Sequence, residues 1–198
     1  MPERIKNIPV ITNNMKIRSF ISVDIEATDD IRTFINEIVE TGANINMVNP
    51  DMIHVTIKFL GDIDEEMVAD IGQKLDLIVE GRKPFVIDLK GVGTFPSIDY
   101  MKVIWIGIEE NTELSDIAHR VEEELVPLGF SREKRSFSPH ITVGRVKSGR
   151  NKQRLRAVVD DYRDVDFGKI IVNKLNLKKS VLKPDGPEYT TLKEFYLL

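Results

Sequence analysis

Two short stretches decide the fold: HVTIKFLG at residues 54–61 and HITVGRV at residues 140–146. Each begins with the frame His-x-Thr-x, in which both intervening positions hold Ile or Val. β-branched residues that alternate with polar ones are typical of a strand with one buried face. Because side chains alternate between the two faces of a strand, each histidine shares a face with the threonine two residues later. The chain has three histidines, and two of them occupy this frame.

The segments around these two stretches repeat in the same order. The first half predicts strand 16–25, helix 29–42, strand 54–61, helix 64–81 and strand 84–96. The second half predicts strand 102–110, helix 111–130, strand 137–146, helix 151–164, a long strand 168–182 and a last strand 189–198. A β-α-β-α-β unit therefore occurs twice, with a His-x-Thr strand in the same position. We expect an α+β fold in which residues 1–15 are a tail and residues 16–198 form one bilobal domain.

The composition excludes several classes of protein. A chain of 198 residues with 41% hydrophobic and 30% charged residues is typical of a globular protein. No apolar run approaches the roughly 20 residues of a membrane span, and no apolar signal segment is visible, so we expect a cytoplasmic monomer without membrane contact. The absence of cysteine excludes disulfides, thiolate nucleophiles and zinc-thiolate sites.

The net charge of −4 argues against a nonspecific nucleic-acid binder, but the charge is unevenly distributed. Residues 131–183 contain 15 Lys or Arg and 5 Asp or Glu, which gives +10 for that segment and −14 for the remainder. A basic segment around the second motif can attract phosphate groups. The alternative is a solvated helix face, which better suits most of the basic side chains between residues 150 and 156.

Two facing imidazoles suit acid–base catalysis at phosphorus. If a pseudo-twofold axis relates the two lobes, His54 and His140 meet across one cleft. With ordinary pKa values of about 6.5, one imidazole can accept a proton from water while the other donates one to the departing oxygen. Thr56 and Thr142 can donate hydrogen bonds to phosphate oxygens, and Lys58, which shares the face of His54 under strict alternation, can balance their charge.

The histidines have two other interpretations. A single His-x-Thr on a strand is usually structural, but matched positions in a repeated architecture argue against coincidence. A zinc site would need a third ligand. The remaining histidine, His119, falls in a helical pattern without an adjacent metal-binding motif, so we expect it to be a surface or packing residue. We predict neither a metal nor any other cofactor.

The sequence resembles the 2H phosphoesterase superfamily, and more closely the RNA 2′,3′-cyclic phosphodiesterases, also called 2′-5′ RNA ligases. The resemblance rests on RSFISVDI, HVTIKFLG, GVGTFP, VIWIGIE, FSPHITVGRV and GPEYTTL and covers residues 16–198. It implies two ferredoxin-like lobes around a V-shaped cleft. It also implies hydrolysis of RNA 2′,3′-cyclic phosphate ends, including those of tRNA fragments, to 2′-phosphomonoesters.

The resemblance also implies roles for individual residues. His54 corresponds to the proton donor, His140 to the proton acceptor, and Thr56 and Thr142 to the phosphate-binding hydroxyls. Arg145 corresponds to the arginine that follows the second motif, although strict alternation points it away from His140, so that it needs a bulge or a strand end to reach the site. Weaker candidates for substrate contact are Arg18, Phe20 and Phe137.

Three alternatives remain open at the level of sequence. Within the same class of enzyme they are 2′-5′ ligation of tRNA halves and hydrolysis of a small cyclic nucleotide. From a different class, the alternative is a non-catalytic module that binds RNA ends. The 2′,3′-cyclic phosphate itself requires a ribose 2′-hydroxyl, so the chemistry is confined to RNA or ribonucleotides.

Overall fold

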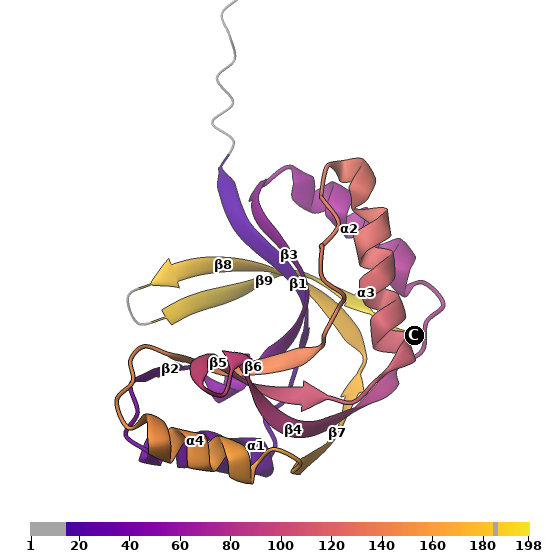
Figure 1. Ribbon diagram of the computed structural model, residues 1–198. Helices are drawn as coiled ribbons and strands as arrows, with labels where there is room; N and C mark the ends of the chain where they lie inside the picture. Colours follow the sequence, from indigo (N-terminus) through magenta and orange to yellow (C-terminus); the bar gives the residue numbers. More distant parts are fainter. Residues whose placement is uncertain (1–14, 184–185) are drawn as a thin grey trace, which may run out of the picture.

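The computed structural model describes residues 15–183 and 186–198 (Figure 1). The strands of this part are β1 (Lys16–Asp24), β2 (Ile45–Met47), β3 (His54–Asp64), β4 (Phe85–Ser97), β5 (Tyr100–Ile108), β6 (His140–Val146), β7 (Asp166–Val172), β8 (Lys174–Lys183) and β9 (Gly186–Tyr196). The α-helices are α1 (Asp29–Glu40), α2 (Met67–Val79), α3 (Thr112–Glu124) and α4 (Lys152–Asp161). Short 3-10 turns lie at Pro50–Met52 and Val126–Leu128. The tail expected over residues 1–15 lies, apart from Met15, outside the described residues.

The strands form one curled antiparallel sheet in the order β7-β4-β5-β6-β3-β1-β8-β9, with β2 paired to β6. The order is symmetric about its middle, where β6 and β3 carry the two His-x-Thr motifs. These two central strands share a single Cα pair, Val55 with Ile141. The sheet therefore has two lobes of four main strands each that meet at a narrow seam (Figure 1).

Each lobe buries its own helical layer. Helices α2 and α3 pack on the lobe of β3, β1, β8 and β9, whereas α1 and α4 pack together on the other lobe (Figure 1). Each layer thus combines one helix from each half of the chain. The prediction of an α+β fold with two lobes is confirmed. The lobes do not coincide with the two sequence repeats, because each lobe takes one helix from each half of the chain.

The helices form where the sequence supplies caps and an apolar stripe. The Thr28 side chain accepts a hydrogen bond from the amide of Ile31 at the start of α1, and Asn111 accepts one from Leu114 at the start of α3. Such caps satisfy amides that have no partner within a helix. The buried residues of α1 recur at helical spacing and face the sheet: Ile31, Phe34, Ile35 and Ile38.

One predicted strand is in fact two. The chain over residues 168–182 divides at Asn173, where β7 ends and β8 begins. Strand β7 pairs with β4 in one lobe, and β8 pairs with β1 and β9 in the other. The sequence of residues 168–182 does not indicate this division, because its apolar and basic residues continue through Asn173. The short strand β2 was not predicted from the sequence either. Among the described residues, no helix is both long and apolar enough to cross a membrane.

Candidate active site

Both motifs present their polar side chains to the same side of the seam. Val55 and Ile141 are fully buried, and they face the core. The residues on either side of each, His54 and Thr56 in β3 and His140 and Thr142 in β6, are half-buried and point to the opposite face.

The antiparallel register decides which motif side chains are neighbours. Because Val55 lies opposite Ile141, His54 aligns with Thr142 and Thr56 aligns with His140. Each histidine therefore has the threonine of the other motif beside it, and the two rings are diagonal neighbours. In a regular ladder such neighbours lie about 7–8 Å apart, and the single Cα pair lets the strands diverge from there.

Each imidazole is held by a backbone carbonyl two residues upstream. The Nδ1 atom of His54 lies 3.0 Å from the carbonyl oxygen of Met52, and Nδ1 of His140 lies 2.8 Å from that of Ser138. A carbonyl oxygen can only accept a hydrogen bond, so Nδ1 carries the proton in both rings. The Nε2 atom of each ring is then left for proton transfer, as an acceptor when the ring is neutral and as a donor when it is charged.

Aromatic rings hold each histidine from the sides. The ring of His54 lies 5.0 Å from Phe20 and 5.2 Å from Tyr189, between ring centres. The ring of His140 lies 5.1 Å from Phe95 and 6.2 Å from Trp105. Phe20 was a weaker candidate in the sequence, while the other three rings were missed because an isolated aromatic on a strand is usually core.

The Trp105 ring depends on a glycine below it. A Cβ at Gly93 would lie 2.2 Å from a carbon of the indole ring, which real packing does not allow. The glycine-rich end of β4 therefore lets a large flat side chain lie against the backbone beside His140. The GVGTFP segment has its structural explanation in this close approach.

A β-bulge in β3 removes Lys58 from the site. The register with β1 shifts between Ile21 and Ser22, so that Ile57 is the extra residue. Beyond the bulge the faces exchange, and Lys58 joins the buried face. Its Nζ donates hydrogen bonds to Glu122 Oε1 at 2.6 Å and to the carbonyl oxygen of Ser131 at 3.0 Å. The expectation that Lys58 shares the face of His54 and balances phosphate charge is therefore wrong.

The same exchange of faces exposes Phe59. Its side chain is 61% exposed and pairs in register with Phe20, whose ring centre lies 6.3 Å away. An exposed aromatic ring thus lies beside Phe20, which itself contacts His54, at a position where alternation predicted a residue pointing to the core.

A bulge at the equivalent position of β6 brings Arg145 onto the site face. The register with β5 shifts between Ile104 and Trp105, which makes Val143 the extra residue. Thr142 pairs with Trp105 and Arg145 pairs with Val103, so Arg145 lies on the same side as His140 and Thr142. The bulge that the sequence required for Arg145 to reach the site is present.

The electrostatics distinguish His54. Burial is the main cause that lowers the pKa of His54, and the positive charges of Lys178 and Arg145 lower it further. The carbonyl of Met52 and the carboxylate of Asp24 act in the opposite direction. On balance these influences lower the pKa of His54 and favour its uncharged form.

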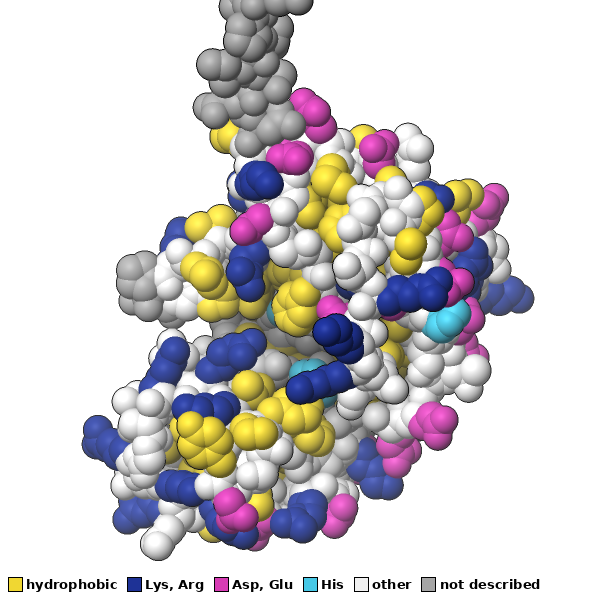
Figure 2. All heavy atoms as spheres, turned by 45° about the horizontal axis from the view of Figure 1, so that its top comes forward, with side chains coloured by type: hydrophobic (Ala, Val, Ile, Leu, Met, Phe, Trp, Pro, Cys, Tyr) yellow, Lys and Arg dark blue, Asp and Glu magenta, His cyan; other side chains and the backbone are white. Residues whose placement is uncertain are grey.

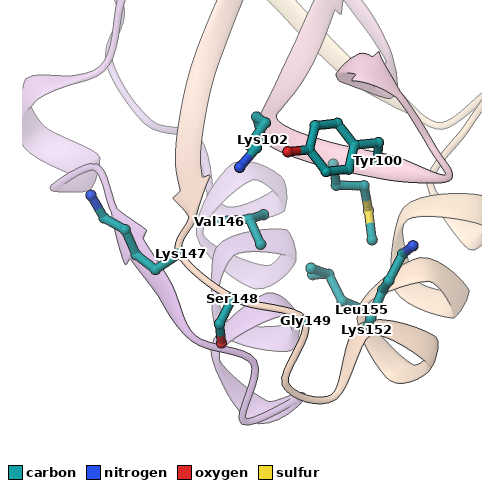
Figure 3. Close-up of a pocket in the computed structure, with 9 residues that line it drawn as sticks. Tyr100, Lys102, Val146, Lys147, Ser148, Gly149, Lys152 and Leu155 are labelled. Atoms are coloured by element: carbon teal, nitrogen blue, oxygen red, sulfur yellow. The ribbon is translucent and has the colours of Figure 1, made fainter.

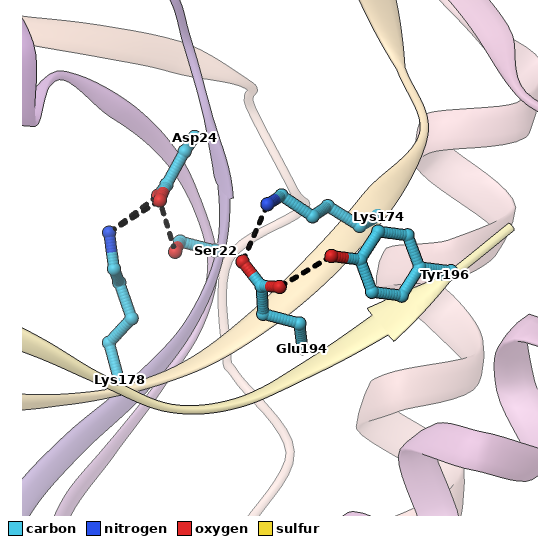
Figure 4. Close-up of polar contacts among 6 residues, drawn as sticks. All are labelled: Ser22, Asp24, Lys174, Lys178, Glu194 and Tyr196. Carbon is cyan, nitrogen blue, oxygen red and sulfur yellow. Dashed lines mark hydrogen bonds and ion pairs between the residues drawn. The ribbon is translucent and has the colours of Figure 1, made fainter.

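The nearby ion pair of Asp24 and Lys178 is well formed. The Lys178 ammonium is almost buried and lies 2.7 and 2.6 Å from the two carboxylate oxygens of Asp24. The hydroxyl of Ser22 donates to the same carboxylate at 3.3 Å (Figure 4). Residue types alone did not reveal this cluster, because its members come from β1 and β8 at opposite ends of the chain.

The remaining candidates lie apart from the paired motifs. Arg18 is exposed on β1, Phe137 is half-buried against the core before β6, and His119 is exposed on α3. Among the residues that the structure describes, no group of three or more His, Cys, Asp or Glu is arranged to hold a metal ion. Figure 2 shows a hollow between the lobes, with Lys and Arg side chains gathered on the lobe below it.

The geometry agrees with comparisons with known proteins. The model of the AKAP7 2'5' RNA ligase-like domain matches residues 20–197. The chain belongs to this family of 2H phosphoesterases. Among its relatives, a Methanocaldococcus jannaschii protein named RNA 2',3'-cyclic phosphodiesterase is 40% identical over 90% of this chain and 100% of its own length. A Methanothermobacter thermautotrophicus protein of the same name is 35% identical over 92% of this chain and 100% of its own.

Members of known structure share the fold. The crystal structure of TT0787 from Thermus thermophilus superposes with a TM-score of 0.76 at 26% sequence identity, over 91% of this chain and 98% of that one. The similarity covers nearly the whole of both chains, so the two-lobed fold is shared.

Proposed function

We propose that the protein hydrolyses RNA 2′,3′-cyclic phosphate ends to 2′-phosphomonoesters with His54 and His140 as its acid–base pair. The observation that carries the proposal is the matched pair of rings, each with Nδ1 bonded to a carbonyl oxygen and Nε2 free on one face of the seam. The names of relatives at 35–40% identity support the same reaction.

The reaction requires one proton to be taken up and another to be delivered. A water molecule attacks phosphorus while Nε2 of His140 accepts its proton, so that the new P–O bond forms without free hydroxide. The bond between phosphorus and the ribose 3′ oxygen breaks, and Nε2 of His54 donates a proton to that oxygen. The product retains the phosphate on the 2′ oxygen, and solvent resets the two rings.

The hydroxyls and the arginine stabilise the charge that develops on phosphorus. Thr56 and Thr142 can each donate a hydrogen bond to a non-bridging oxygen, because they share the face of the imidazoles. Arg145 reaches that face through its bulge and can bind the same oxygens with two parallel N–H groups. Such groups cost no reorganisation when the charge appears, which is the main way that a site of this kind accelerates the reaction.

The lowered pKa of His54 fits a donor that is charged only in the complex. In the free protein, burial and the charges of Lys178 and Arg145 disfavour the imidazolium. A bound cyclic phosphate brings a negative charge that partly neutralises Arg145 and attracts a proton to His54. The resulting imidazolium can then donate its Nε2 proton to the leaving oxygen.

The experiment is a product assay on an RNA oligonucleotide with a 2′,3′-cyclic phosphate end, run in EDTA. We expect a 2′-phosphate product, because the bond to the 3′ oxygen breaks, and full activity in chelator, because the proton transfers use imidazoles alone. A 3′-phosphate product would reverse the direction of opening. Activity lost in EDTA and restored by zinc or manganese would indicate metal catalysis. Stoichiometric binding without turnover would indicate an RNA-end binding module.

The assignment of donor and acceptor has its own test. A phosphodiester with a 4-nitrophenolate leaving group needs no protonation as it departs. His54→Ala should therefore recover most of its loss on such a substrate, while His140→Ala should not. Recovery in His140→Ala instead would exchange the two roles.

A further inference from the structure

A cavity of about 250 Å³ lies where β6 ends. Its lining comes from the start of β5, the loop after β6 and helix α4: Tyr100, Met101, Lys102, Val146, Lys147, Ser148, Gly149, Lys152 and Leu155. Figure 3 shows Tyr100 and Lys102 on one side of it and Leu155 and Lys152 on α4 across from them, while the Lys147 side chain extends outward from the loop after β6. None of these residues belongs to the site described above.

The cavity has an apolar floor and a basic rim. Met101 and Leu155 are buried and Val146 is half-buried, whereas the three lysines are exposed. The Tyr100 ring is 60% exposed, and Lys102 Nζ lies 4.8 Å from its centre. A flat apolar group and an anion can therefore be bound side by side, which are the two parts of a nucleotide.

The rim keeps its positive charge. Within the described residues, neither Lys102 nor Lys147 takes part in an ion pair, and Lys152 Nζ donates to the backbone carbonyl oxygen of Asp99 rather than to a carboxylate. The carboxylate of Asp99 accepts from Arg156 Nη1 at 2.6 Å. Lys102 and Lys147 therefore add positive charge around the cavity, and no carboxylate of the described residues pairs with either of them.

Strand β6 connects the cavity directly to the paired histidines. His140, Thr142 and Arg145 lie along the site face of this strand, and Lys147 follows Arg145 by two residues, a distance of roughly 7 Å at about 3.3 Å per residue. A polymer whose end lies between the histidines and whose next phosphates follow Arg145 would arrive at the rim formed by Lys102 and Lys147.

We propose that this cavity binds a nucleotide of the RNA upstream of the cyclic phosphate, with Tyr100 against its base and Lys102 and Lys147 on its phosphate. This proposal rests on the proposed function, since it assumes that the RNA end lies between His54 and His140. The volume supports it, because sites that enclose a whole small molecule measure about 300–1,000 Å³. A smaller cavity suits one unit of a chain that is anchored elsewhere.

The test compares two double variants on substrates of increasing length. Lys102→Gln/Lys147→Gln removes the rim charge. Its matched control, Lys16→Gln/Lys83→Gln, removes two exposed lysines outside the cavity. The substrates are a 2′,3′-cyclic mononucleotide and oligoribonucleotides of two to ten residues with cyclic phosphate ends, assayed as kcat/KM at several salt concentrations. Tyr100→Ala is the second variant and tests the aromatic contact.

We expect the rim variant to hydrolyse the mononucleotide like wild type but to lose roughly tenfold on the longest RNA, as two screened phosphate contacts would predict. The slope of log kcat/KM against log salt should fall by about 0.7 for each lost contact. Tyr100→Ala should lose activity only on the RNAs long enough to reach the cavity. If kcat/KM depended on RNA length and on salt in the same way for the rim variant and its control, the proposal would be overturned.

Failure of the proposed function gives a different pattern. If wild type hydrolyses neither the mononucleotide nor the RNA, the catalytic proposal is wrong, and the cavity is judged by direct binding. A fluorescein-labelled ten-residue RNA with a 2′-phosphate end should then still bind more weakly to Lys102→Gln/Lys147→Gln than to the control. Unchanged affinity in that measurement would remove the cavity as an RNA site.

Discussion

Strands β3 and β6 start alike and end differently. Both begin with histidine, an aliphatic residue, threonine and a second aliphatic residue, and in both that second aliphatic residue is the bulged one. After the bulge, β3 continues with Lys58 and Phe59, and β6 with Gly144 and Arg145. The first of each pair points to the interior and the second points to the site.

The divergence after the bulges makes the site asymmetric within a symmetric fold. The proposed acid–base pair is symmetric, since both rings are hydrogen-bonded through Nδ1 to a carbonyl oxygen two residues upstream. The residues beyond the bulges provide an exposed aromatic ring on one side and a cation on the other. A nucleotide end is itself asymmetric, with a base and a phosphate, so this difference can orient the substrate.

The largest effect on the rate of hydrolysis is expected at the two histidines, which β3 and β6 have in common. His54→Ala and His140→Ala each remove one proton-transfer partner, which is worth about 10²–10⁴-fold in rate. The double variant should be little worse than either single one, because the rings act as a unit. Exposed His119 on α3 is the matched control. A loss in folded His119→Ala comparable to that of the motif variants would contradict the paired mechanism.

The next effect is expected at Arg145. Arg145→Gln removes a charged donor to the phosphate, a change that typically costs about 10²-fold in kcat. Arg145→Lys should recover only part of this, because lysine keeps the charge without the two parallel N–H groups. The loss should be similar for a cyclic mononucleotide and for RNA, as the phosphate is common to both. A loss confined to RNA would assign Arg145 to the polymer instead of to the reacting group.

A smaller effect of a different kind is expected at Phe59. Stacking of a base on an aromatic ring is worth about 1–3 kcal/mol, so Phe59→Ala should raise KM roughly tenfold with little change in kcat. Phe59→Trp should keep the affinity. Tyr196→Ala removes another exposed aromatic ring, from the far end of β9, and should change neither KM nor kcat. A fall in kcat without a rise in KM would mean that Phe59 supports His54 rather than the base.

The two interior positions should affect stability more than catalysis. Lys58→Met leaves Glu122 Oε1 and the carbonyl oxygen of Ser131 without the donor that Lys58 provides, at a cost of about 1–3 kcal/mol in the free energy of unfolding. Lys58→Met/Glu122→Gln should regain part of it. Gly144→Ala places a Cβ 2.9 Å from Ile45 Cγ2 and 3.1 Å from Met47 Sδ, which costs about 1–3 kcal/mol through overpacking.

Denaturant unfolding and mononucleotide kinetics together check these two positions. We expect lowered stability with kcat/KM within about threefold of wild type, since neither side chain faces the histidines. If Lys58→Met kept normal stability but lost as much activity as Arg145→Gln, Lys58 would have to bind the phosphate after all.

These positions also explain what could be predicted from the sequence. The alternation of Val55 and Ile57 with His54 and Thr56 was enough to place both motifs on strands with a common polar face, and the repeat was enough to pair them. Alternation failed at Lys58 because a bulge depends on pairing with β1, a neighbour that the local sequence does not specify. For Arg145 a bulge was foreseen only because the residue had to reach the site.

The helices and the aromatic neighbours could not be predicted for a similar reason. Helix α1 has clear caps and an apolar stripe, but nothing in its sequence says that it packs with α4 on the lobe that does not contain β1. Tyr189 belongs to β9, far along the chain from His54, and contacts it only because β8 and β9 extend the sheet beside β1. Contacts of this kind depend on tertiary pairing, which residue spacing does not encode.

The smallest effect on activity is expected at Asp24. This residue is the register partner of His54 in β1, whereas the register partner of His140 in β5 is Gly107, which carries no charge. The Asp24 carboxylate raises the pKa of His54, against burial and the charge of Lys178. Asp24→Asn removes the raising influence and leaves Lys178 unneutralised, so the pKa of His54 should fall further. If His54 is the donor, it must be protonated to act, and the alkaline side of the bell-shaped pH profile of kcat/KM should then move to lower pH.

The profile of Asp24→Asn is to be measured beside that of Asp88→Asn, which breaks a surface ion pair with Lys169 and should leave both sides of the bell in place. The bell belongs to the coupled pair of rings, so the shift is read as a displacement of one side and not as the pKa of one residue. If the acid side moves to lower pH while the alkaline side stays, His54 is the group that must be neutral. His54 would then be the base that accepts the proton from water, and the roles of the two histidines would be exchanged.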